Sequence, residues 1–276
     1  MSDGHGGRRV HDATEGVKLY TMQHQRHDSS GTRRWQLSSA VRAALTVFTA
    51  FAFITACSDA TGTDADNIEL QYDFSTGFQG WEAAFADYPV GKESEWGISS
   101  GLASLPFPLD GNRKAILLTG ANQSDDLFMY ITRGVTDLAP NGRYAIRFHV
   151  TVATDAPRNC TGIGGAPGEA VVLKVGATAT APERIIDAAQ YYRTNFDYGS
   201  QLNGGRDAST IGNLANSNAN CFSPRYELKE FDSGATPATY TTDANGRLWL
   251  IVGIDSGFEG TTTAYIASVR VEIDPR

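Results

Sequence analysis

The chain is poor in the residues on which many catalytic and metal sites depend. It has 276 residues, with only three cysteines and five histidines. Only one of these histidines, His149, follows residue 57. A Ser-His-Asp triad or a histidine-containing zinc site in that part would therefore have to use this single side chain. The sequence contains no recognisable catalytic motif, which favours a binding role over catalysis.

Basic residues are also scarce. The chain has 23 Lys and Arg against 31 Asp and Glu, giving a formal net charge of −8 at pH 7. Nucleic-acid phosphates need a basic surface, so this balance argues against a nucleic-acid partner. An acidic surface is compatible with calcium or with neutral sugars, although solubility alone also explains it.

Long apolar runs are nearly missing, apart from the uncharged segment AALTVFTAFAFITA at 43–56. Arginines precede this segment, and it is shorter than most membrane-spanning helices. A basic region followed by a short apolar run and small residues predicts a secretory signal over 1–56. Met22 is an alternative start, which would leave 1–21 untranslated.

The apolar run ends in Ile-Thr-Ala directly before Cys57. An aliphatic residue and two small ones before a cysteine resemble the lipobox of bacterial lipoproteins. The resemblance implies cleavage before Cys57, lipid on that cysteine and a place in the cell envelope, with Ser58 favouring the outer membrane. A buried cysteine in an uncleaved helix is the alternative. The small, polar residues of 57–67 predict a flexible tether between the lipid and the fold.

The other two cysteines, Cys160 and Cys221, lie in loop-like sequence. In an oxidising compartment they are expected to form a disulfide, with two free thiols as the alternative. In the chain-entropy model, closing a loop of this length stabilises a fold by about 4 kcal/mol.

Strand patterns dominate 68–276, which we expect to form one domain. Residues 145–152 alternate between apolar and polar side chains, so they predict a half-buried strand with His149 on its outer face. Further strands are expected over 69–74, 97–104, 114–119, 127–133, 170–176, 226–231, 247–254 and 264–273. Many short strands separated by glycine-containing turns indicate an all-β sandwich or barrel.

The segment 177–224 lacks such a pattern and is predicted to be one long loop insertion, stapled by the disulfide. Long loops in compact domains are usually functional or disordered, and the disulfide favours order. Polar and aromatic residues of the insertion are candidate ligand contacts on an exposed surface: Tyr191, Tyr192, Asp197 and Tyr198. Trp81 and Trp249 are expected in the core.

The opening segment 74–81, Phe-Ser-Thr-Gly-Phe-Gln-Gly-Trp, resembles the start of galactose-binding-like jelly rolls, which include many carbohydrate-binding modules. The resemblance implies a jelly-roll β-sandwich of about nine strands, a glycan ligand and a structural calcium ion. These modules often carry paired acidic residues just before the last strand, and the sequence at 265–269 lacks them.

Acidic residues in other loops could supply the oxygen ligands that Ca²⁺ prefers. The candidates are Asp125, Asp126, Asp255 and Glu259. Acidic residues in turns more often cap the backbone or carry solvated charge.

Three functions follow from these observations. The preferred one is a non-catalytic, lipid-anchored module that binds glycan or another extracellular ligand, with Glu169 as a further candidate contact. The second is a glycoside hydrolase with paired carboxylates, Asp125 or Asp126 acting with Glu169, Asp255 or Glu259. The third is a structural or protein-interaction lipoprotein.

Overall fold

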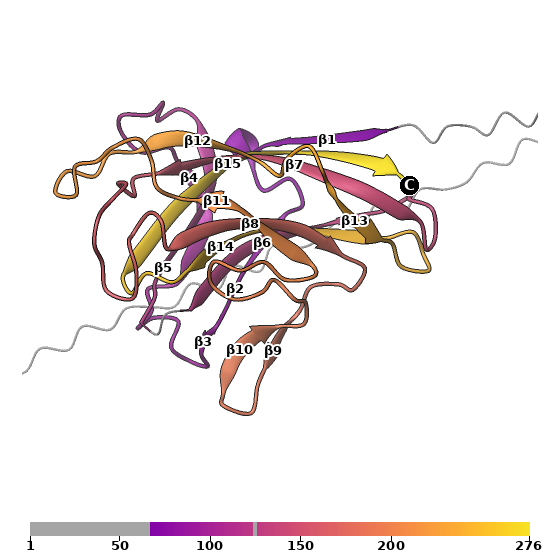
Figure 1. The fold of residues 1–276 in the computed structure, drawn as a ribbon, viewed down its shortest axis with the longest axis horizontal. Coiled ribbons are helices and arrows are strands. Elements are labelled where there is room, and N and C mark those ends of the chain that lie inside the picture. Colours follow the sequence, from indigo (N-terminus) through magenta and orange to yellow (C-terminus); the bar gives the residue numbers. More distant parts are fainter. Residues whose placement is uncertain (1–66, 124–125) are drawn as a thin grey trace, which may run out of the picture. The chain divides into compact units, whose positions relative to one another are not determined.

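The computed structural model describes residues 67–123 and 126–276. Strands make up about half of the described chain, and two large sheets pack against each other with a small third sheet at one side (Figure 1). The β-sandwich confirms the fold class that the sequence predicts. The signal, the lipidation site Cys57 and nearly all of the tether fall outside the described residues. In the described part, no helix is long and apolar enough to cross a membrane.

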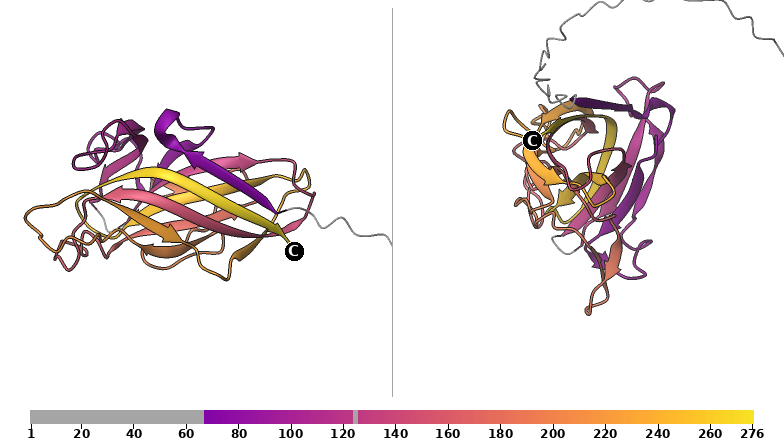
Figure 2. Two further views of the ribbon diagram at one scale, coloured as in Figure 1. Left: turned by 90° about the horizontal axis from the view of Figure 1, so that it is seen from above. Right: turned by 90° about the vertical axis from the view of Figure 1, so that its right-hand side faces the viewer.

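Sheet A has the strand order β12-β7-β15-β5-β4. Its path strands are β4 (Ser99–Ser104), β5 (Lys114–Ala121), β7 (Arg143–Thr154), β12 (Glu227–Asp232) and β15 (Thr261–Pro275). Two further strands complete it: β1 (Ile68–Asp73) pairs with β15, and β13 (Ala238–Thr241) pairs with β7. The long strands β7 and β15 run side by side across the sandwich (Figure 2). Consequently, β15 joins β7 on one side to β1 and β5 on the other.

Sheet B has the order β11-β8-β14-β6-β2. Its strands are β2 (Glu82–Ala86), β6 (Leu127–Val135), β8 (Val171–Thr178), β11 (Ala208–Asn213) and β14 (Leu248–Ser256). The small sheet consists of β3 (Tyr88–Pro89), β9 (Arg184–Ile186) and β10 (Tyr191–Thr194). A single 3₁₀ turn, η1 (Phe74–Thr76), follows β1. From β5 to β8 the chain crosses between sheets A and B at every step, as in a jelly roll.

The core lies between the two sheets and is filled by alternate residues of each strand. Phe148 and Val150 from β7 face Val252 and Ile254 of β14 in one buried cluster. Burying such a side chain contributes roughly 1.5–3 kcal/mol. Trp81 is buried as expected, with its ring edge-on to Tyr72 at 5.4 Å between ring centroids.

All nine segments predicted as strands are strands, but the expected loop at 177–224 is wrong. It contains β9, β10 and β11, and β11 pairs with β8 as an edge of sheet B. These strands are only three to six residues long, and much of their surface is polar or exposed. Periodicity over so few residues gives little signal, which also explains why the short strands β2, β3 and β13 escaped prediction.

The disulfide between Cys160 and Cys221 is present, as expected. Cys160 lies in the loop between β7 and β8, whereas Cys221 lies between β11 and β12. The bond therefore joins two loops that leave the same end of the sandwich, rather than tying one loop to a sheet.

Candidate functional site

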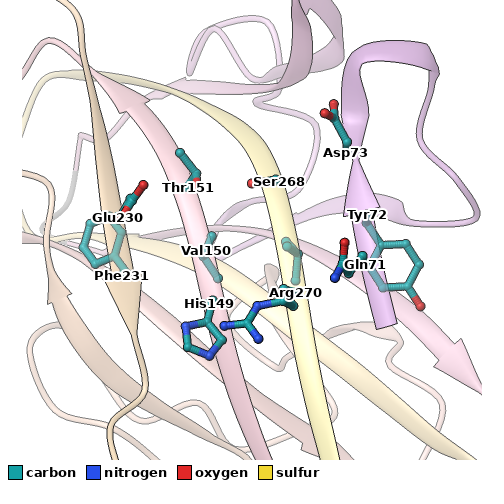
Figure 3. A pocket seen from close by; sticks show the side chains of 11 residues that line it. Gln71, Tyr72, Asp73, His149, Val150, Thr151, Glu230, Phe231, Ser268 and Arg270 are labelled. Carbon is teal, nitrogen blue, oxygen red and sulfur yellow. The ribbon is translucent and has the colours of Figure 1, made fainter. Parts of the chain in front are cut away.

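A groove of about 400 Å³ crosses the outer face of sheet A, over β1, β15, β7 and β12 (Figure 3). Strand alternation produces its lining. Tyr72, Val150 and Val269 turn into the core, so the residues beside them turn outward. The outward side chains in the groove are Gln71, Asp73, His149, Thr151, Glu230, Ser268 and Arg270.

Strand register arranges these side chains in two rows that run across four strands. The floor row consists of Asp73, Ser268, Thr151 and Glu230. The wall row consists of Gln71, Arg270, His149 and Asp232. The middle positions of the floor row carry only hydroxyl groups, whereas the middle positions of the wall row carry a guanidinium and an imidazole. This difference in side-chain size hollows the face of the sheet.

Ion pairs fix the wall row in place. His149 lies between two carboxylates, with Nδ1 at 3.3 Å from Asp232 and Nε2 at 3.2 Å from Glu272. Arg270 Nη1 lies 2.5 Å from the same Glu272 oxygen. Arg147 donates two hydrogen bonds to Asp232, at 3.0 and 2.5 Å. The side chains of Arg270 and His149 are therefore held in place before any ligand binds.

Two carboxylates beside the groove are ionised at neutral pH, because hydrogen bonds hold their pKa values low. The Arg147 hydrogen bonds, assisted by the Gly234 N–H and by His149, lower the pKa of Asp232 to about 2. The Ser75 N–H lowers the pKa of Asp73. The groove offers the guanidinium of Arg270 as a donor, the hydroxyl groups of Thr151 and Ser268 as donors and acceptors, and the carboxylates of Asp73 and Glu230 as acceptors, all on one sheet.

An apolar area adjoins the floor row. At Ala267 a bulge in β15 interrupts its pairing with β7, and Ala267 packs under Leu105 from the β4–β5 hairpin. Tyr226 and Tyr265 meet edge to face at 5.6 Å beside this cluster. At the hairpin tip, Phe107 is 91% exposed. Aromatic and aliphatic surface therefore lies next to the groove on the same face of sheet A.

The predicted ligand residues Tyr191 and Tyr192 lie outside the groove, on β10 in the small sheet. Both are half-buried, and arginine guanidinium groups cover their rings. Arg184 stands 3.7 Å from the centroid of Tyr192, and Arg193 stands 5.1 Å from that of Tyr191. Tyr191 and Tyr192 therefore lie on a different sheet from the polar rows of sheet A.

Tyr198 is not an exposed contact, which corrects the sequence-based expectation. Its ring is 7% exposed and stacks on Phe128 of sheet B at 3.8 Å. The loop after β10 folds over the outer face of sheet B, where Gly176 lets the main chain approach. A Cβ on that glycine would lie 2.0 Å from the carbonyl oxygen of Asp207. Asp197 shapes the same loop by accepting N–H groups of Gly199 and Arg206, which lower its pKa.

Asp255 is fully buried, and its carboxylate lies 2.7 Å from Nζ of Lys174. The same lysine donates to the main-chain oxygens of Tyr198 and Asn203, both at 2.9 Å. Lys174 thus links β14 to the loop of residues 195–207, which covers the outer face of sheet B and is called the covering loop below. Burial raises the pKa of Asp255 to about 7 and that of Asp87 to about 6. Sequence reasoning missed this cluster. A lone charged residue, Lys174, in the apolar run of β8 is the signal that could have indicated it.

The structure describes three of the four predicted calcium ligands. Asp126 is near enough to Asp255 to raise the pKa of that carboxyl. The main-chain N–H of Glu259 donates to the main-chain oxygen of Ile163 in a neighbouring loop. Asp125 lies outside the described residues. Within 67–123 and 126–276, no three His, Cys, Asp or Glu side chains are placed to hold one metal ion.

The carboxylates proposed for glycoside hydrolysis are also engaged in the fold. Asp255 is closed off from solvent, so no substrate reaches it in this arrangement. Glu169 accepts the Asn159 N–H at 2.7 Å and thereby braces the loop between β7 and β8.

The position of Trp249 also differs from the expectation. It was expected in the core, but Leu248 and Leu250 take the core positions of β14, so the indole faces outward from sheet B and is half-buried. The long apolar run around it hid the alternation, because neighbouring residues on both faces are apolar.

No family model matches the chain, and no curated protein matches it. Solved structures do resemble it. A carbohydrate-binding module described for mannan recognition, TmCBM27, has 12% identity and a TM-score of 0.36, covering 75% of this chain and 98% of that one. The K1 cleaved adhesin domain of Lys-gingipain from Porphyromonas gingivalis has 18% identity and a TM-score of 0.33, and the match covers 76% of this chain and 99% of that domain. TmCBM61, solved with β-1,4-galactotriose, has 12% identity and a TM-score of 0.32, and the match covers 72% of this chain and 92% of that one. Similarity of this degree transfers no ligand or site to the chain.

Proposed function

We propose that this chain is a lipid-anchored module of the cell envelope that binds carbohydrate in the groove on sheet A. The observation that carries the proposal is the pair of polar rows. A sugar hydroxyl both donates and accepts hydrogen bonds, so it is best satisfied where donors and acceptors alternate. The floor row and the wall row offer this alternation across four strands.

The balance of charge favours a neutral ligand. Arg270 would attract a phosphate or sulfate, but Asp73 and Glu230 stand at the two ends of the floor row and would repel it. A metal or organic cation would meet Arg270 in the middle of the groove. A neutral chain of sugar rings is repelled by neither the carboxylates nor the guanidinium. Its hydroxyl groups can form hydrogen bonds along the groove.

The rigidity of the groove supports binding with little reorganisation. Its residues lie on strands, Glu272 forms an ion pair with Arg270, and Asp232 lies 3.3 Å from Nδ1 of His149. A site whose side chains are already ordered loses less conformational entropy when a ligand binds. The aromatic surface of Tyr226 and Tyr265 gives a second ring of the same ligand a face to contact.

The setting of the module remains part of the proposal. Lipid on Cys57 and a tether over 57–67 would hold the domain at a membrane while leaving the groove free. The proposal also includes calcium binding by acidic loop residues. Asp125 and Asp126 precede β6, and Glu259 follows β14. The role of calcium would be to order these loops, because Ca²⁺ takes carboxylate and main-chain oxygens from flexible segments.

Isothermal titration with neutral β-linked oligosaccharides of glucose, mannose, xylose and galactose tests the proposal, with calcium and with EDTA. We expect heat for at least one of them. Ser268→Trp should abolish groove binding by filling the floor. Thr239→Trp is the matched control, because Thr239 is exposed on the same face of sheet A but outside the groove. Equal binding by both variants would remove the groove from the proposal.

A further inference from the structure

A second recess lies where β7 and β15 separate at one end of sheet A. The pairing of these strands ends at Thr154 and Ala264, and the chain beyond that point lines a recess of about 230 Å³. The loops joined by the disulfide also line it, and so do Asp155, Thr261 and Thr263. None of its lining residues belongs to the groove, so it is a separate site.

Strand register places the polar side chains of this recess on one face. Ala153 packs on the outer face of sheet A and stands opposite Tyr265. Asp155 and Thr263 are each one alternation further along, so they also face outward. The hydroxyl of Tyr226, whose ring meets Tyr265, donates to the Asp155 carboxylate. This hydrogen bond confirms the outward direction of the carboxylate.

The carboxylate of Asp155 is partly removed from water but has no cation beside it. Within 67–123 and 126–276, no basic side chain pairs with it, and burial raises its pKa. Burial also raises the pKa of Asp87 and Asp255, but each of those carboxyls has a cation. Their partners are Arg193 and Lys174. Aspartate that is removed from water is normally paired, so a bound cation would complete the site at Asp155.

Two arginines lie close to this recess in sequence but leave its charge uncompensated. Arg158 and Arg225 are both exposed, and neither lines the recess. Both act instead on the carboxyl of Glu227, whose pKa they help to lower. The recess therefore offers one negative charge without a competing cation of the protein.

The remainder of the recess suits an alkyl chain. Apolar surface comes from the disulfide and from Leu214, Pro157, Pro167 and Pro224. The volume is below the roughly 300–1,000 Å³ of pockets that enclose drug-sized ligands, so it suits a single side chain. An ammonium group has three donors, which a carboxylate and nearby hydroxyl groups can share. A guanidinium fits less well, because it pairs best with a carboxylate whose two oxygens are both free, and Tyr226 already donates to Asp155.

We propose that this recess binds a primary ammonium group carried on an alkyl chain, either a lysine side chain of a partner protein or a free diamine. Asp155 pairs with the ammonium group, and the hydroxyl groups of Thr261 and Thr263 accept its remaining hydrogen bonds. The prolines and the disulfide contact the alkyl chain. This site goes beyond the proposed function and does not depend on carbohydrate binding in the groove.

Exposed apolar side chains beside the recess separate the two sources of this group. Phe222 follows a lining cysteine and is 98% exposed, and Ile163 lies two residues after the lining residue Thr161 and is 71% exposed. A peptide that places its lysine in the recess would extend over these loops and contact them. A small diamine would be held by the recess alone.

NMR titration of the isotopically labelled protein tests the proposal. The probes are cadaverine, the capped peptide Gly-Lys-Gly, and the same peptide with its lysine acetylated on Nε. We expect both ammonium probes to shift the amide signals of Asp155, Thr261 and Thr263. The dissociation constant should be on the order of 1 mM, because few atoms are buried. The acetylated peptide should shift none of them, because acetylation removes the charge.

Variants of the protein give the second arm of the test. Asp155→Asn should weaken binding of both ammonium probes by about tenfold or more. Asp274→Asn, at the other end of β15, is the matched control and should keep the affinity. Ser268→Trp, which fills the groove, should also keep it. Phe222→Ser should weaken the peptide alone if the source is a lysine side chain, and neither probe if it is a free diamine.

Equal binding of the acetylated and unmodified peptides would overturn the proposal, and this comparison needs no variant to fold. An absence of shifts at the recess with both ammonium probes would overturn it as well. Either result would leave carbohydrate binding in the groove untouched, because the sugar titrations are read at a different site.

Discussion

Ser268 of β15 stands directly opposite Thr151 of β7, and these two short side chains form the floor of the groove on sheet A. Larger side chains in the next row, Arg270 and His149, stand above them. The hollow thus results from side-chain size on paired strands and needs no loop to shape it. Because the pairing belongs to the central strands of the sheet, the floor should stay fixed when the loops move.

Arg270 should be the main donor to a bound sugar. Hydrogen bonds to charged groups are worth roughly 1.5–3 kcal/mol, so Arg270→Ala should weaken binding in the groove by about 10- to 100-fold. Thermal unfolding should change little, since exposed ion pairs contribute roughly 0–1 kcal/mol. Arg206→Ala, on an exposed loop of the other sheet, is the control in the same titration. An unchanged affinity in Arg270→Ala would show that Arg270 is not the main donor to the sugar.

The buried pair of Lys174 and Asp255 should matter for stability rather than for binding. Lys174→Met leaves the Asp255 carboxylate buried without a cation and frees the covering loop at Tyr198 and Asn203. Such a loss costs roughly 3–5 kcal/mol, measurable by urea denaturation. The double variant Lys174→Met/Asp255→Leu should lose less than the sum of the single variants, because the two residues are coupled. Strict additivity would show that the pair does not act as a unit.

Stability should fall as the pH rises from 5 to 7.5. Burial raises the pKa of Asp87 to about 6 from its ordinary 3.8. The folded state therefore binds this proton more tightly than the unfolded state. Its stabilising contribution is complete below pH 3.8 and is lost as the pH rises through 6.

Asp87→Asn should reduce the fall in the free energy of unfolding between pH 5 and pH 7.5 by about 1–3 kcal/mol. Burial also raises the pKa of Asp255, so this carboxyl contributes to the slope in the same direction. Urea denaturation at a series of pH values measures both proteins. Identical slopes in the variant and the wild type would contradict this account of Asp87.

The disulfide should contribute a large share of the total stability. Its cysteines are 61 residues apart, for which chain entropy predicts about 4 kcal/mol. Cys160→Ser/Cys221→Ser should unfold at markedly lower urea concentration than the wild type. The groove should keep its affinity while the variant stays folded, because neither loop contributes to it. Equal midpoints would show that the two loops are held together without the bond.

Lipidation of Cys57 is tested by mass spectrometry of the protein isolated from membranes. We expect a mature chain that starts at Cys57 with acyl groups on it, and a soluble product from Cys57→Ser. A chain that retains the first 56 residues would contradict the proposed envelope location.

Local sequence predicted the sheets better than the sites. The alternation in 145–152 identified β7 and placed His149 on the outer face, and that was correct. The groove depends on which residues of four distant strands stand opposite each other, such as Gln71 with Arg270. That register involves pairings far apart in the chain, and no local pattern specifies it.

The same limit explains the errors on sheet B. Tyr198 lies in polar sequence and looked exposed, but the covering loop folds it onto Phe128. Trp249 lies in apolar sequence and looked buried, but it faces outward because apolar residues occupy both faces of β14. In both cases, burial depends on what a distant segment covers.

A crystal structure with a bound neutral oligosaccharide would show whether the groove on sheet A is the binding site. We expect sugar rings over Ser268 and Thr151, with hydroxyl groups hydrogen-bonded to Arg270 and to the carboxylates of the floor row. A bound sugar that leaves this groove vacant in every molecule of the crystal would contradict it.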